Sequence, residues 1–304
     1  MRPLGLFFAV ALAVGGQTLP EYARQCAALI ATVPAFDCGK GVAAAVTVDG
    51  KVPASYKPGM SCDRPALLPY GPASDGQCVP FSRALVLRDD AQVQISAFCR
   101  QKKIRPEGSN VYDEIDVIAH SVANGTTCWF EAIAPSPDKP LDGKHVPSPM
   151  EPAGATFWDK PALVAEKKCV ECHDSDPFMY SPYVAQTGQL PRDPFGKYHN
   201  DVGAVFSKWP KPSAIASEGS PCVGCHRIGS LETCKTTMLQ SVGHGKQEGA
   251  DAWAMKYPNS HWMPAGNPLT QKAWDVIYQQ SMDKLAACCK NPKAAGCSIT
   301  PLPR

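Results

Sequence analysis

The chain has 304 residues, enough for one or two domains of about 100 to 200 residues each. Hydrophobic residues make up 44% and charged residues 19%, a balance that excludes both a disordered chain and a polytopic membrane protein. With 30 Lys and Arg against 28 Asp and Glu, the formal charge of +2 provides no broad basic surface, so we expect no nucleic-acid partner.

The N-terminal segment has the layout of a secretory signal peptide. Arg2 precedes an apolar run over residues 4–14, which ends in the small residues Gly15 and Gly16. This run is too short to cross a bilayer core, which takes about 20 residues. We therefore expect cleavage near Gly16 to remove residues 1–16. The mature chain is then expected to have no transmembrane segment and to be periplasmic or extracellular.

Residues 17–134 are predicted to form a disulfide-linked, mostly antiparallel β domain, either a sandwich or a barrel. A short helix over residues 20–30 is expected first, ending before Pro34. Asn124-Gly125 is a typical hairpin turn. The β-rich runs, several of them alternating, are residues 84–87, 92–98, 112–120 and 127–133.

A proline-rich connector and a mainly helical, loop-rich region complete the predicted α+β class. Six prolines between positions 135 and 152 indicate an extended linker over residues 135–155. Residues 156–304 form the second predicted domain. Its expected helices are residues 161–168, 231–242 and 269–289. The last of these carries an apolar stripe expected to face the interior: Trp274, Ile277, Met282 and Leu285.

Two copies of one short pattern, C-x-x-C-H, stand out in this second region. The first motif comprises Cys169, Cys172 and His173, and the second comprises Cys222, Cys225 and His226. This is the attachment sequence of a c-type haem, in which two thiols bond the porphyrin vinyl groups and the His is the proximal iron ligand. Two haem c groups are therefore the expected cofactors.

The cysteines taken alone would also fit a redox disulfide or a zinc site. Each Cys pair could form a redox-active bond, or the four thiolates could bind one zinc ion. Neither role requires the histidines. With 7 His in the chain, a His would follow both motifs by chance with a probability of roughly 1 in 2,000.

With these two motifs and a Met-Pro at Met263, residues 156–304 resemble the multihaem c-type cytochromes. The resemblance implies single-electron transfer between unidentified donor and acceptor proteins. Two alternatives stay open: a peroxidase-like dihaem enzyme with one open iron face, and a β domain that binds a partner or a glycan. A solvated acidic face on an alternating strand accounts for the candidate residues of that last site more simply. These candidates are Asp113, Glu114, Asp116, Trp129, Phe130 and Glu131.

The distal iron ligands are less well defined by the sequence. The Met-Pro pair that begins at Met263 resembles the distal-ligand segment of small c-type cytochromes. Met263 is therefore the candidate distal ligand for the second motif, and His261 is the alternative. For the first motif the candidate is His199, followed by His244. Any of these histidines could equally be an ordinary loop residue.

The remaining ten of the 14 cysteines predict five disulfides in an oxidising compartment, formed within each half of the chain. Cys99 with Cys128, on strands expected to be neighbours, is the leading pair. Proximity suggests Cys26 with Cys38 and Cys62 with Cys78. The adjacent Cys288 and Cys289 are expected to bond different partners, drawn from Cys234 and Cys297.

Overall fold

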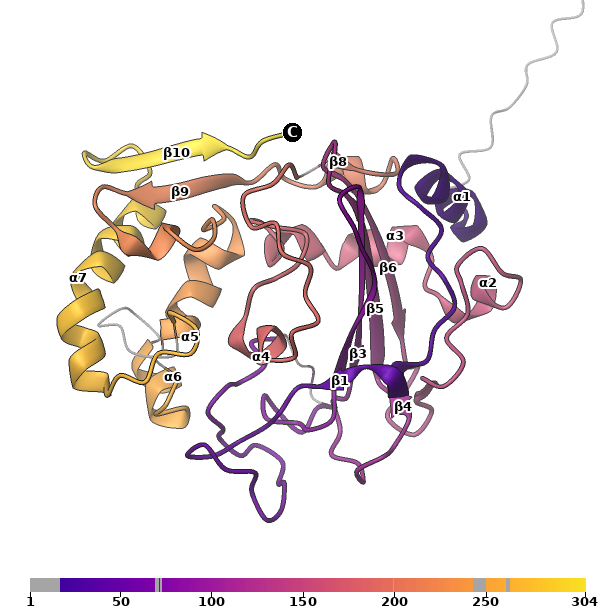
Figure 1. Cartoon of the computed structure of the whole chain (residues 1–304), viewed down its shortest axis with the longest axis horizontal. Coiled ribbons are helices and arrows are strands. Elements are labelled where there is room, and N and C mark those ends of the chain that lie inside the picture. The colour runs from indigo at the N-terminus through magenta and orange to yellow at the C-terminus, as the bar shows by residue number, and fades with distance from the viewer. Residues whose placement is uncertain (1–16, 69–70, 72, 199, 243–249, 261–262) are drawn as a thin grey trace, which may run out of the picture.

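The computed structural model describes residues 17–68, 71, 73–198, 200–242, 250–260 and 263–304. The predicted signal peptide, residues 1–16, lies outside the described residues. The described chain combines a mostly antiparallel sheet with helices, which confirms the α+β class (Figure 1). None of the helices described is both long and apolar enough to cross a membrane.

The centre of the molecule is one open six-stranded sheet. In spatial order its strands are β1 (Val42–Ala43), β2 (Arg83–Asp89), β3 (Val93–Arg100), β5 (Glu114–Ser121), β6 (Thr126–Ile133) and β8 (Asn200–Asp201). The first five run antiparallel to their neighbours, and β5 and β6 form the predicted hairpin, with Gly125 at a φ of 70°. The expected sandwich or barrel is wrong, because the described strands form this open sheet and two small two-stranded ribbons.

Both faces of the sheet are covered, and helices and loops do the covering. On one face, helix α1 (Leu19–Leu29) packs with the Tyr22 ring centroid 5.2 Å from that of Phe130. On the other face, Phe98 contacts Tyr183 of α4 (Pro182–Ala185), with 6.2 Å between the ring centroids. A sheet covered on both sides buries polar as well as apolar side chains, and nearly all of β3 and β6 is buried.

The chain beyond the proline-rich segment contributes to this same sheet. Strand β8 pairs in parallel with β6, aligning Asn200 with Thr126 and Asp201 with Thr127. The smaller ribbons are β4 (Val111–Tyr112) with β7 (Leu141–Asp142), and β9 (Ser213–Ser217) with β10 (Cys297–Pro301). The predicted β region and the segment carrying the motifs therefore share a sheet.

The helices expected in the second region are present. They are α3 (Pro161–Glu166), a π-helical turn (Thr233–Thr237) continuing into α5 (Met238–Val242), and α7 (Gln271–Lys290). Two further helices, α2 (Gly154–Phe157) and α6 (Ala250–Lys256), were not predicted. In α7, Trp274, Met282 and Leu285 are buried, but Ile277 is 53% exposed, contrary to the prediction. At about 100° per residue, Ile277 lies on the far side of Trp274 from Met282, and so it falls off the buried stripe.

The chain forms five disulfides, and each joins two cysteines of the same half of the chain, as expected. The predicted Cys62–Cys78 bridge is confirmed, and so are the separate partners of the adjacent cysteines, which form Cys234–Cys289 and Cys288–Cys297. This number of disulfides indicates folding in an oxidising, extracytoplasmic compartment.

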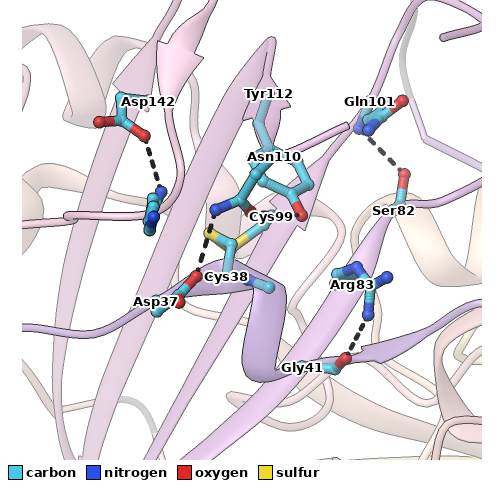
Figure 2. Close-up of a disulfide and its surroundings, with 12 residues drawn as sticks. Asp37, Cys38, Gly41, Ser82, Arg83, Cys99, Gln101, Asn110, Tyr112 and Asp142 are labelled. Atoms are coloured by element: carbon cyan, nitrogen blue, oxygen red, sulfur yellow. Dashed lines mark hydrogen bonds between the residues drawn. A yellow bond between two sulfur atoms is a disulfide. The ribbon is translucent and has the colours of Figure 1, made fainter. Parts of the chain in front are cut away.

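Two predicted disulfide pairs are wrong: Cys99 with Cys128, and Cys26 with Cys38. The observed bridges are Cys26–Cys128 and Cys38–Cys99. Strand β5 lies between β3 and β6 and keeps these two strands about 10 Å apart. Cys99 is also aligned with Ile115 and Cys128 with Ala119, four residues further along β5, so the two cysteines are beyond the reach of a bridge. Figure 2 shows Cys38 bonded to Cys99 beside hydrogen bonds from Asn110 to Asp37 and from Arg83 to Gly41.

Candidate functional site

The first motif begins where α3 ends. Lys168 adopts a left-handed conformation, with a φ of 53°, which stops the helix and starts the short 3-10 turn Cys169–Glu171. His173 follows, and its Nδ1 donates to the carbonyl of Pro177 at 2.9 Å. Burial lowers the pKa of His173 to about 4. The ring is therefore neutral, and because a carbonyl only accepts, its proton is on Nδ1 and Nε2 keeps the lone pair.

The second motif follows strand β9 and is built in a similar way. Ser220 caps the 3-10 turn Pro221–Val223 by accepting from the amide of Cys222 at 3.3 Å. His226 donates from Nδ1 to the carbonyl of Arg227 at 2.8 Å. Both motif histidines thus present Nε2, the orientation that metal-binding histidines adopt when a carbonyl holds the other nitrogen.

The four motif cysteines are the ones left unpaired. Ten of the 14 cysteines form disulfides, and Cys169, Cys172, Cys222 and Cys225 are free thiols. Neither motif therefore contains the disulfide that a redox-active cysteine pair would form. The four thiols also do not lie close enough together to share one zinc ion. Among the described residues, the one group of side chains close enough to bind a metal consists of carboxylates.

A cavity of about 650 Å³ adjoins both motifs. Its lining includes Cys172 of the first motif and Cys222, Cys225 and His226 of the second. Met263, the predicted distal ligand of the second motif, also lines it, and its carbonyl accepts from the Trp274 indole at 2.5 Å. Phe178 and the buried residues of α5 and α7, such as Met238 and Leu285, supply much of the apolar wall.

The donor set and the cavity fit a c-type haem. Each motif offers two free thiols and an imidazole whose Nε2 has no hydrogen-bond partner among the described residues. The mostly apolar cavity lies beside the three residues of the second motif and beside Cys172 of the first. The volume lies within the range of about 300 to 1,000 Å³ typical of cofactor sites. The other candidate ligands, His199, His244 and His261, lie outside the described residues.

Side chains on and next to the sheet contact the first motif, and the sequence patterns did not predict these contacts. The Trp129 ring of β6 lies edge-on to His173, at 5.3 Å between centroids, and is 3% exposed. Tyr198 donates its hydroxyl to the His173 carbonyl at 2.5 Å. Only the parallel pairing of β8, two residues beyond Tyr198, brings these side chains together, and no periodicity in the sequence signals it.

An acidic triad, Glu114, Asp116 and Glu131, lies on the sheet strands next to Trp129. The three carboxylates approach one another within 4.8 Å. Arg100 and Lys102 form ion pairs with Glu114. Burial, followed by the charge of Glu114, raises the pKa of Glu131 to about 7 and that of Asp116 well above its usual range. The solvated acidic face expected from the sequence is therefore wrong, since Glu114 and Glu131 are buried.

No protein-family profile, curated protein or solved structure matches this chain. The assignment of a function therefore depends on the residues themselves.

Proposed function

We propose that this protein is an exported dihaem c-type cytochrome that transfers single electrons. The observation that carries the proposal is the state of the motif residues. The four cysteines outside the disulfides are the two C-x-x-C pairs. Each adjoining histidine is held through Nδ1, and its Nε2 has no partner in the part of the chain that the structure describes. A haem bound at each motif would accept and release one electron at a time through its iron.

The roles of the chain's own residues follow from the donor set. Cys169 and Cys172 would attach one haem and Cys222 and Cys225 the other, with His173 and His226 as proximal ligands. Met263, on the wall of the cavity that adjoins His226, is the proposed distal ligand there, and His199 remains the candidate for the first motif. Residues 156–304 would form the dihaem region.

The surroundings of each motif would keep water from the cofactor. Trp129 packs on His173, and the Tyr180 ring lies 5.7 Å from that of His226. Burial of this kind tunes the reduction potential, because it changes the cost of carrying charge at the iron. Donor and acceptor would be redox proteins of the periplasm or the extracellular space.

The test is haem stoichiometry after expression in a host that matures c-type cytochromes. The wild type is expected to carry two haems per chain by pyridine haemochrome assay and intact mass. Replacing both cysteines of either motif by Ala should leave one haem. The matched control is the Cys62→Ala/Cys78→Ala variant, which also removes two cysteines but breaks a disulfide, and it should keep both haems.

A wild-type chain that matures without haem, or with zinc in its place, would overturn the proposal. A high-spin ferric signal that changes on addition of peroxide would replace electron transfer by the peroxidase-like alternative.

A further inference from the structure

The residue after each motif histidine reaches across to the segment of the other motif. Asp174, next to His173, is fully buried, and its Oδ2 accepts from the amides of Leu231 and Thr233 at 2.8 and 3.2 Å. Both amides lie just beyond the second motif. A buried carboxylate needs such donors, because leaving it unpaired is costly.

Arg227, next to His226, makes the reciprocal connection. Its Nε donates to the carbonyl of Ser175 at 2.9 Å, and its Nη1 donates to the carbonyl of Gly196 at 2.8 Å. The residue is 7% exposed. A guanidinium that spans two carbonyls holds them in a fixed geometry, which a lysine does not reproduce.

The contact between the two segments leaves no spare room. A Cβ on Gly229 would lie 1.9 Å from Asp174 Oδ1, so this position accepts only glycine while the carboxylate stays in place. Thr233 also donates its hydroxyl to the carbonyl of Cys172 at 3.4 Å, which adds a direct link to the first motif. The segments are therefore joined by hydrogen bonds from charged side chains in both directions and by the close approach of Gly229 to the Asp174 carboxyl group.

We propose that Asp174 and Arg227 are positioning residues that hold the two motif histidines in a fixed relation and thereby set the rate of electron exchange between the two haem sites. This inference rests on the proposed function. Ordinary packing would need neither two charged residues at equivalent positions of the two motifs nor their crossed connections. Electron transfer forms no bond, but its rate falls with the distance between donor and acceptor, so a change in the relative position of the two histidines would change the rate.

The test compares Asp174→Ala and Arg227→Lys with a matched control, Asp113→Ala. Asp113 is also a buried carboxylate that accepts from two backbone amides, those of Lys102 and Lys103, but it lies in the β region. The readouts are haem content, the near-infrared ligation bands, the magnetic interaction between the two ferric sites, and electron exchange after flash photoreduction.

The Asp174→Ala and Arg227→Lys variants are both expected to keep two haems and their ligation bands. The magnetic interaction should change, and electron exchange should be slower than in the wild type. The control should leave both readouts as in the wild type. Two loaded haems with unchanged interaction and exchange in the two variants would overturn this inference and leave the proposed function standing, whereas absence of haem from the wild type would overturn the proposed function itself.

A second set of variants decides the matter if Asp174→Ala fails to mature. Gly229→Ala introduces the methyl that collides with the carboxylate, so it should alter the magnetic interaction while Asp174 itself is retained. In the Asp174→Ala/Gly229→Ala double variant the collision is gone. Measured on apoprotein by denaturant unfolding, the second substitution should then cost less than it does alone. Additive costs would contradict the proposed contact.

Discussion

The two C-x-x-C-H motifs share their chemistry but differ in their surroundings. The first packs against the covered sheet, with Trp129 beside His173 and the acidic triad on the neighbouring strands. The second follows a two-stranded ribbon and adjoins the cavity walled by α5 and α7, and its Cys225 is exposed. The same sequence pattern therefore lies in a buried, charge-rich site and in a more open, apolar site. If each motif holds a haem, as proposed, this difference would give the two haems different reduction potentials.

The largest expected difference between the two regions is in the free energy of unfolding that their disulfides contribute. Cys26–Cys128 closes a separation of 102 residues, whereas Cys288–Cys297 closes one of 9. The chain-entropy relation gives about 5 kcal/mol for the long loop and about 2.5 kcal/mol for the short one. Replacing each pair by Ala and measuring unfolding in guanidinium chloride should reproduce this order. Equal losses would show that loop length does not govern these bridges.

Removing one buried indole from each region should separate the two sites. Trp129→Ala and Trp274→Ala each truncate a nearly fully buried side chain and should cost about 3 to 5 kcal/mol of unfolding free energy. In the proposed dihaem protein, Trp129→Ala should change the spectrum of the haem at the first motif alone, and Trp274→Ala that of the haem at the second motif alone. A single variant that alters both haems equally would mean that the two environments are not independent.

The acidic triad predicts a pH dependence that belongs to the first region. The pKa of Glu131 is raised to about 7 by burial, so between its ordinary value and pH 7 the folded protein holds a proton that the unfolded chain has lost. Stability should therefore fall as the pH rises through this range. Glu131→Gln should flatten that fall, whereas Glu218→Gln, an exposed site near the second motif, should leave it unchanged. Urea unfolding from about pH 4 to 8 measures both slopes, and an unaltered slope in Glu131→Gln would refute the assignment.

The smallest effect on stability is expected at Met263. Met263→Leu conserves volume and should cost less than about 1.5 kcal/mol of unfolding free energy. It should nevertheless abolish the Met/His near-infrared band of the haem proposed at the second motif. Met238→Leu is the control, because Met238 lines the same cavity. Persistence of the band in Met263→Leu would rule out Met263 as the ligand.

Local patterns predicted the parts of the fold that depend on near neighbours. The helix before the first motif, the hairpin at Asn124-Gly125 and the separate bridges of Cys288 and Cys289 were all expected and are all present. The pairing of Cys99 failed, because consecutive strand-like runs do not reveal that β5 lies between β3 and β6. The position of Ile277 failed because helical spacing does not say how wide the buried stripe is.

The residues around the first motif illustrate the same limit. Acidic side chains alternating along a strand usually face water, but here both faces of the sheet are covered, so Glu131 is buried. Asp174 and Arg227 carry no signal in a single sequence, because their role arises only when the two motif segments meet.

The order of residues along the chain by itself determined the two thiol pairs with their histidines, since this chemistry needs a fixed spacing of a few residues. Only the tertiary structure decided what each histidine packs against, which cysteines bond across the sheet, and how Asp174 and Arg227 link the two segments. Those contacts join positions far apart in the chain, and they depend on strand order and burial, which no local pattern encodes.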